Sequence, residues 1–129
     1  MEKLVINATE NTPEVIFDPA SGNFEISGES RPENVREFYE PILNWLNEFS
    51  SSVKSDQGTL TFKFKFEYFN SSSAKFILDV LKKISEIHSK GADFKIIWYY
   101  DDGDEDMQEA GEEMSKMVKL PFSYIEVLE

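Results

Sequence analysis

The sequence predicts an α/β domain that spans residues 1–129, with a mixed, mainly parallel sheet and helices mostly on one face. The first observation is the order of strand-like and helix-like segments, β-β-α-β-α-β-α-β, because strands joined by helices run parallel with right-handed crossovers. The second is a strand, residues 59–69, in which apolar and polar side chains alternate. A strand covered by helices on both faces is apolar on both sides, so this alternation indicates an open or partly covered face.

The chain is predicted to start with a β-hairpin. Two short β-prone runs, PEVIFD at residues 13–18 and NFEISG at residues 23–28, are joined by the four residues PASG. Because proline, serine and glycine favour turns, the two runs are expected to pair with each other.

The segment SRPENVREFYEPILNWLNEFS, residues 30–50, is predicted to form the first helix. Ser30 and Glu33 have the S-x-x-E spacing of a capping box, and Pro32 lies in the first turn, where its missing N–H is not needed. Apolar residues then recur at helical spacing and are expected to face the core. They are Val35, Phe38, Tyr39, Ile42, Leu43, Trp45, Leu46 and Phe49.

A serine-rich loop through Gly58 is expected to follow this helix and to lead into the alternating strand TLTFKFKFEYF. Because successive side chains of a strand point to opposite faces, the strand is expected to have one apolar and one polar face. The apolar face is predicted to contain Leu60, Phe62, Phe64, Phe66 and Tyr68. The polar face is predicted to contain Thr61, Lys63, Lys65 and Glu67.

The rest of the chain continues the alternation of helix and strand. A second helix is predicted from Ser72 to Lys90 and ends at Gly91. Its expected buried residues are Ala74, Ile77, Val80, Leu81, Ile84 and Ile87. The strand DFKIIWYY, residues 93–100, precedes a third helix with Met107, Ala110, Met114 and Met117 on one side. The segment PFSYIEVL, residues 121–128, is predicted to be the last strand.

Composition excludes several classes of function. The chain has no cysteine, which excludes disulfides, thiolate catalysis and cysteine-bound zinc. Its formal net charge is −12, so the phosphates of nucleic acids and anionic lipids would repel its surface, and neither is an expected partner. No apolar run reaches the roughly 18–20 residues of a membrane span, and no basic-then-apolar leader is present, so we expect a soluble, cytoplasmic protein.

The sequence shows no enzyme signature and predicts no cofactor. Glycine-rich phosphate-binding loops and the G-x-S-x-G motif are absent, and a two-histidine metal site is impossible because His88 is the single histidine. His88 is expected to pack in the apolar stripe of the second helix. Eight acidic residues and no basic one lie between Asp101 and Ser115, in a spacing unlike an EF-hand. This run is interpreted as a solvated helix start, with a docking surface for a basic partner and a metal site as alternatives.

A polar cluster of one asparagine and three serines, Asn70–Ser73 in the motif YFNSSSAK, follows the alternating strand. It lies at the carboxyl end of a predicted parallel strand, where open α/β sheets place functional loops. It also lies at a helix N-terminus, where backbone N–H groups and the helix dipole favour an anion. The cluster is therefore either a simple helix cap or a site that accepts a phosphate.

Several motifs, in order along nearly the whole chain, resemble the SiaC family of bacterial regulatory phosphoproteins. They are NTPEVIFDPASGNFEISGESRPENVREFYEPILNWL, YFNSSSAKFILDVLKKI and IIWYYDDGDEDMQEAGEEM. The resemblance implies a STAS-like fold and a regulatory protein rather than an enzyme. It implies that a GHKL-type serine/threonine kinase phosphorylates the protein and that a PP2C-type phosphatase reverses this. The unmodified form would then bind and activate a diguanylate cyclase.

The resemblance places the phosphate acceptor on the residue after the asparagine, which is Ser71, with Ser72 and Ser73 as alternatives. The predicted contact surface around it contains Asn70, Ser72, Lys75, Leu78 and Lys82. Leu78 lies outside the buried stripe of its helix, which fits an interface but also an ordinary exposed leucine. Two alternative functions are a STAS-like scaffold that is not phosphorylated and a small ligand- or metal-binding domain.

Overall fold

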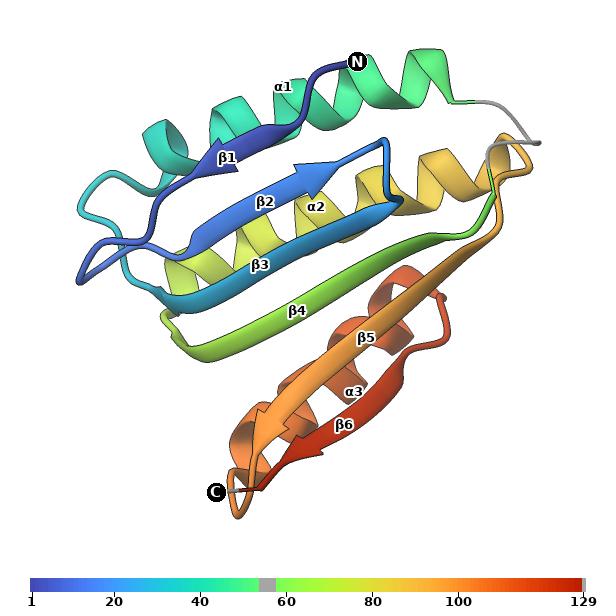
Figure 1. The fold of residues 1–129 in the computed structure, drawn as a ribbon. Coiled ribbons are helices and arrows are strands. Elements are labelled where there is room, and N and C mark those ends of the chain that lie inside the picture. Colours follow the sequence, from blue (N-terminus) through green and yellow to red (C-terminus); the bar gives the residue numbers. More distant parts are fainter. Residues whose placement is uncertain (54–57, 129) are drawn as a thin grey trace.

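The computed structural model describes residues 1–53 and 58–128, and within these the chain forms one six-stranded sheet with three helices. The strands lie in sequence order, and the helices lie on one side of the sheet (Figure 1). The first three strands pair antiparallel and the last four pair parallel. The elements are β1 (Leu4–Ile6), β2 (Glu14–Asp18), β3 (Asn23–Ser30), α1 (Val35–Ser52), β4 (Leu60–Phe69), α2 (Ser71–Ser89), β5 (Phe94–Asp101), α3 (Glu105–Val118) and β6 (Ser123–Val127).

This architecture confirms the predicted fold class, a mixed and mainly parallel sheet with helices on one face. The β2–β3 hairpin is present as expected, with Phe17 opposite Phe24. The three-residue strand β1 was not predicted, and it extends the sheet by pairing with β2. The serine-rich loop expected after α1 lies partly in residues 54–57, outside the described residues.

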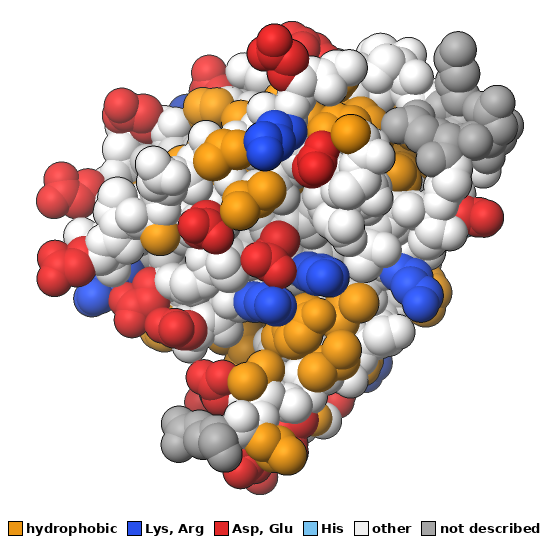
Figure 2. Space-filling model, viewed as in Figure 1, with side chains coloured by type: hydrophobic (Ala, Val, Ile, Leu, Met, Phe, Trp, Pro, Cys, Tyr) orange, Lys and Arg blue, Asp and Glu red, His pale blue; other side chains and the backbone are white. Residues whose placement is uncertain are grey.

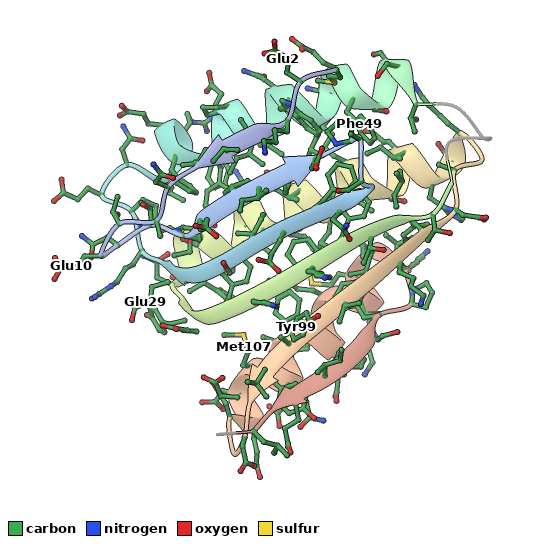
Figure 3. The ribbon with its side chains drawn as sticks, viewed as in Figure 1. Glu2, Glu10, Glu29, Phe49, Tyr99 and Met107 are labelled. Atoms are coloured by element: carbon green, nitrogen blue, oxygen red, sulfur yellow. The ribbon has the colours of Figure 1, made fainter. Side chains whose placement is uncertain are left out.

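The sheet has one face packed on helices and one open face, as the alternation in β4 indicated. Phe62, Phe64 and Phe66 are buried, whereas Lys63 and Lys65 between them are partly exposed. The open face carries acidic and basic side chains close together (Figure 2). Among these, Lys65 forms an ion pair of 3.3 Å with Glu25, and its ammonium group lies 4.7 Å from the ring centre of Tyr99, which Figure 3 labels on β5.

The prediction that Tyr68 shares the apolar face of β4 is wrong. The register between β3 and β4 shifts after Gly28, which pairs with Phe66, so that the next pair joins Glu29 to Tyr68. This bulge reverses the alternation, because one extra residue turns the following side chains to the opposite face. Tyr68 is consequently 51% exposed, and Phe69 instead packs at the helix side, with its ring centre 5.5 Å from that of Phe66.

The predicted capping box at Ser30 is also wrong. Ser30 is the last residue of β3 and is buried, and its carbonyl accepts a hydrogen bond from the backbone N–H of Asn70. The cap of α1 is Asn34, whose side-chain oxygen accepts from the backbone N–H of Glu37 at 3.1 Å. Asparagine is as good a cap as serine, and pairing with β4 keeps Ser30 in the strand. The apolar stripe of α1 faces the core as expected, including the fully buried Tyr39.

Helix α2 buries Ile77, Val80, Leu81, Ile84 and Ile87 as predicted, together with Phe76. Ala74 is only partly buried, because it lies at the edge of the helix that faces α3. His88 does not pack in this stripe. It is exposed at the last turn, although its ring centre lies 4.5 Å from that of Phe94.

The core beneath α3 is organised around Trp98, which is fully buried. Its ring stacks on Phe64 and Phe122 at 5.9 Å between ring centres, and its Nε1–H donates to the carbonyl of Met107 at 2.9 Å. Met107 is the buried first-turn residue of α3, labelled in Figure 3. Gly111, one turn later, lies so close that a Cβ there would meet Trp98 at 2.5 Å. A glycine at this position therefore lets α3 sit directly against β5.

Candidate functional site

The candidate site is the junction where β4 ends and α2 begins. Asn70 is the N-cap, and its side-chain oxygen accepts from the backbone N–H of Ser73 at 2.9 Å. Its backbone carbonyl accepts from the N–H of Ala74 at 3.0 Å. Ser71 and Ser72, in the first turn of the helix, are both exposed. The junction is therefore a firmly capped helix start that presents two hydroxyl groups to solvent.

The third serine of the cluster, Ser73, has a structural role. It is 0% exposed, and its hydroxyl donates to the backbone carbonyl of Ser30 at 3.0 Å and accepts from the Ser30 hydroxyl at 2.9 Å. Because the Ser30 hydroxyl gives its proton to Ser73, the hydroxyl of Tyr39 donates to Ser30, at 2.6 Å. These three hydroxyl groups join the end of β3, α1 and the start of α2. Ser73 is therefore inaccessible to a kinase in the folded protein.

Burial raises the pKa of the Tyr39 phenol to about 12, although hydrogen bonds with Ser30 and Ser73 partly oppose this rise. An ionised phenolate would lose its solvation in this site, so the folded state holds the proton more tightly than the unfolded chain does. Folding stability linked to Tyr39 is therefore fully present below pH 10, the ordinary pKa, and is lost as the pH rises through about 12.

We therefore expect the free energy of unfolding to fall by about 2–3 kcal/mol more in the wild type than in Tyr39→Phe between pH 9 and pH 12.5. The phenylalanine variant cannot ionise at this position, so the difference between the two curves isolates the contribution of Tyr39. Urea unfolding at a series of pH values measures both curves. Parallel curves would show that Tyr39 ionises as easily in the folded state as in the unfolded one.

Two cationic side chains lie near the first turns of α2. The first turn of α2 contains no acidic residue, whereas that of α3 contains Glu105 and Asp106. Lys75 lies one turn after Ser71, and its ammonium group lies 5.5 Å from the ring centre of Phe76. The guanidinium group of Arg36, from α1, lies 5.7 Å from the same ring centre. The helix start can therefore carry an added negative charge without facing a carboxylate of its own first turn.

The predicted contact residues fall into two groups. Asn70, Ser72, Lys75 and Lys82 lie along the start and one side of α2, and the last three are exposed. Leu78 is partly buried and lines a groove of about 380 Å³ between α2 and α3, with Lys75 at its rim. The other residues that line this groove are Phe69, Ala74, Ala110, Glu113, Met114 and Met117. Lys82 does not line the groove.

The α3 side of this groove was not predicted as part of the site. The helical spacing of Met117 predicts a position on the apolar side of α3, and Met117 lines the groove there, yet it is 65% exposed. Helical spacing shows which side chains share a face, but not whether a second helix covers that face. The sequence signal for this side of the groove is the apolar stripe of α3, which includes Met114 and Met117.

The acidic run matches the interpretation of a helix start. The side chain of Asp104 caps α3 by accepting from the backbone N–H of Met107 at 3.0 Å, and Glu105 and Asp106 occupy the first turn. Within residues 1–53 and 58–128, no group of three or more carboxylate or histidine side chains is arranged to hold a metal ion. No helix among the described residues is both long enough and apolar enough to cross a membrane.

The described residues form an α/β domain with a half-covered sheet, two exposed serines at a capped helix start, and an apolar groove between α2 and α3. The chain belongs to the SiaC family, since the model of this family, described as SiaC family regulatory phosphoprotein, matches residues 6–127. This membership confirms the resemblance noted in the sequence and the assignment to a regulatory rather than an enzymatic class.

The chain is also similar to one curated relative and to solved structures of SiaC. The chain is 30% identical over 123 residues to an uncharacterized protein of Pseudomonas aeruginosa strain UCBPP-PA14, with 95% of each sequence covered. Its fold is similar to the crystal structure of apo-SiaC from P. aeruginosa, with a TM-score of 0.83, 29% identity and 96% and 98% of the two chains covered. A structure of the diguanylate cyclase SiaD in complex with its activator SiaC, also from P. aeruginosa, gives a TM-score of 0.86 at 29% identity, covering 96% and 99%.

Proposed function

We propose that this protein is a partner switch, whose unmodified form binds and activates a diguanylate cyclase and whose form phosphorylated on Ser71 does not. The family of regulatory phosphoproteins supports the modification, and the SiaC relative described as the activator of SiaD supports the partner. The observation that carries the proposal is the division of the serine cluster into exposed and buried members. Ser71 is exposed at the first position of α2, whereas Ser73 is buried in a hydrogen-bond network.

The proposed mechanism is electrostatic and steric. A phosphate on Ser71 adds about 1.5–2 negative charges and three acceptor oxygens to an exposed helix start. The helix dipole and Lys75 tolerate this charge in the free protein, so the domain stays folded. In a complex, the same phosphate would lie against a partner surface that is fitted to a neutral hydroxyl. Burying that charge without a partner would weaken the complex strongly.

The proposed modifying enzymes are a GHKL-type serine/threonine kinase and a PP2C-type phosphatase. The acceptor can be assigned with three single variants, Ser71→Ala, Ser72→Ala and Ser73→Ala, each incubated with the purified GHKL-type kinases of the protein's own genome. We expect Ser71→Ala to take up no phosphate and to remain bound to the cyclase in the presence of kinase and ATP. Intact-mass spectrometry measures the phosphate, and a pull-down with the cyclase measures the binding.

The serine variants also separate function from folding. Ser73→Ala is expected to accept one phosphate like the wild type but to lose about 1–2 kcal/mol of stability, because the buried hydroxyl of Ser30 then loses a partner. Phosphate on Ser72 alone would move the acceptor by one residue. A chain that binds the cyclase but takes up no phosphate from any of these kinases would instead be a scaffold without the switch.

A further inference from the structure

The last strand, β6, forms a free edge of the sheet. It comes last in the strand order, and within residues 1–53 and 58–128 it pairs with β5 alone (Figure 1). All five of its residues are exposed, and Ile125 and Val127 are 42% and 41% exposed. Unpaired strand edges are templates for another strand, and many proteins protect them with charged residues. Glu126 is the single charged residue of β6, so this edge is open to pairing.

The hydrogen bonds to β5 fix which backbone groups of β6 face the free edge. The carbonyl of Val127 accepts from the N–H of Asp102 at 2.9 Å, so the backbone groups of Val127 point toward β5. The N–H and C=O groups of one strand residue point to the same side, and this side alternates along the strand. Ile125 therefore also faces β5. Tyr124 and Glu126 direct their N–H and C=O groups away from the sheet.

From this arrangement we infer that β6 pairs antiparallel with β6 of a second copy of the chain, about a two-fold axis at Ile125. In this register Tyr124 of each copy lies opposite Glu126 of the other, and each such pair exchanges both of its N–H···O bonds. A register shifted in one direction would place Glu126 opposite Glu126, where like charges repel each other. A shift in the other direction would leave Glu126 beyond the end of the opposite strand. The two-fold register at Ile125 avoids both losses.

The side chains on the open face of β6 fit the same pairing. Ile125 lies opposite Tyr99 in the register with β5, and the two-fold axis would bring Ile125 of both copies together. Ile97 and Val127 extend this apolar strip, and apolar side chains gather over β5 and β6 in Figure 2. A second copy would therefore cover apolar surface that is exposed in the single chain.

The two ends of β6 carry opposite charges, which favours the antiparallel direction. At its carboxyl end lies the acidic turn after β5, with the exposed Asp101 and Asp102, and Asp101 pairs with Val127. Before its amino end lie the exposed Lys116 and Lys119, at the end of α3. Of the ion pairs found among the described residues, none involves these four side chains. Antiparallel pairing places the acidic end of each copy beside the basic end of the other, which opposes the repulsion between two acidic chains.

This pairing does not depend on the proposed switch. A two-fold axis perpendicular to the sheet extends the sheet across both copies and keeps their helices on the same face. Ser71 and Ser72 belong to α2, which packs beside α1 and α3 rather than at the free edge of β6. The paired form would therefore present two copies of the exposed serine pair.

Cross-linking tests the register directly, because the chain has no cysteine. Opposite residues that are not hydrogen-bonded to each other have Cα atoms about 4.5 Å apart, close enough for a disulfide. We expect Ile125→Cys to form a disulfide-linked dimer with oxidised glutathione, because its single cysteine meets its own copy at the axis. Non-reducing electrophoresis and intact-mass spectrometry measure the product.

The matched control for this cross-link is Ser123→Cys. Its two copies would lie about 14 Å apart along the paired strands, so this variant is expected to stay unlinked. Mixed with Val127→Cys, which lies opposite it in the proposed register, Ser123→Cys is expected to give the mixed dimer. Equal cross-linking of Ile125→Cys and Ser123→Cys alone would overturn the register, because one geometry cannot join both.

Light scattering over a concentration series tests the pairing without a cross-link. We expect the wild type to pass from monomer to dimer as its concentration rises, and Ile125→Lys to weaken the dimer at least about tenfold. Glu126→Pro removes an outward N–H but keeps the bonds to β5, so it is expected to weaken the dimer in the same way. Val5→Lys, on the opposite edge strand β1, where Val5 is 51% exposed, is expected to leave the dimer within about twofold. Melting temperatures check that the variants are folded.

Three results of this series would overturn the inference. The first is a wild type that stays monomeric at every concentration, and the second is a dimer that survives both Ile125→Lys and Glu126→Pro. The third is a series of larger species that Val5→Lys also dissociates, because β1 would then pair with β6 of the next copy in a head-to-tail chain. Loss of the dimer in both β6 variants, together with its retention in Val5→Lys, would support the two-fold pairing.

Discussion

A Ser71→Glu variant is expected to bind its diguanylate cyclase at least about tenfold more weakly than the wild type, while its melting temperature stays the same or rises slightly. The two effects have different origins. In the free protein, a carboxylate in the first turn of α2 interacts favourably with the helix dipole, and this turn has no other acidic residue. In the proposed complex, the same carboxylate would take the place of a neutral hydroxyl at the edge of the contact surface, where its desolvation would be unfavourable.

The matched control for this variant is Ser89→Glu, which adds the same side chain to an exposed serine at the opposite end of α2. We expect the control to bind like the wild type and to melt slightly lower, because a negative charge is unfavourable at a helix C-terminus. Titration calorimetry and thermal unfolding measure the two properties on the same samples. Equal weakening by both variants would mean that net charge, rather than the position of Ser71, controls the complex.

A Trp98→Ala variant is expected to lose about 3–5 kcal/mol of unfolding free energy, a large share of the 5–15 kcal/mol typical of a domain. Trp98 is fully buried, and its ring packs against Phe64, Phe66, Phe69 and Phe122. Its Nε1–H also holds the carbonyl of Met107 in the first turn of α3. Removing the indole leaves a cavity beneath α3 and frees that hydrogen bond.

The control for this substitution is Tyr99→Ala, the next residue of β5, whose ring lies on the open face and is only partly buried. We expect Tyr99→Ala to cost about 1 kcal/mol, because little cavity forms on an open face. Urea unfolding followed by circular dichroism gives both values. A loss below about 1 kcal/mol for Trp98→Ala would contradict the packing of α3 on β5 described above.

Features of the fold that depend on local periodicity were predictable from the sequence. The alternation of Phe62 and Phe64 with Lys63 and Lys65 fixed which face of β4 is covered, because side-chain direction in a strand changes with every residue. The apolar stripes of α1 and α2 likewise identified their buried faces, because helical spacing brings such residues to one side. These patterns depend only on residues that are close in the sequence, so they can be recognised without information about the rest of the chain.

The errors arose where a distant segment decides the local structure. Ser30 looked like a helix cap, but pairing with Phe69 of β4 keeps it in β3. Tyr68 looked like a core residue, but the bulge in the same pair of strands turns it outward. The three residues of β1 carry too little pattern to be recognised alone, and they form a strand because β2 offers an edge to pair with.

The serine cluster shows the same division between local and distant causes. Residue types alone identified Asn70–Ser73 as a helix start, and the structure confirms Asn70 as the cap. They could not distinguish Ser73 from its neighbours, because its hydrogen-bond partner Ser30 lies 43 residues away in the chain. Burial of Ser73 leaves Ser71 and Ser72 as the exposed hydroxyls, and the choice of Ser71 between them stays a prediction.

Titration of the cyclase with enzymatically phosphorylated protein tests most directly whether Ser71 controls the complex. The protein is treated with the GHKL-type kinase, the singly phosphorylated form is separated, and its Kd for the cyclase is compared with that of the unmodified form. We predict that phosphorylation on Ser71 weakens binding to the cyclase more than Ser71→Glu does, because the phosphate carries more charge. Since Ser71→Glu is expected to weaken binding at least about tenfold, the loss for the phosphorylated form should exceed this value. PP2C-type phosphatase treatment is expected to restore the original Kd. An unchanged Kd for protein carrying phosphate on Ser71 would contradict the partner switch.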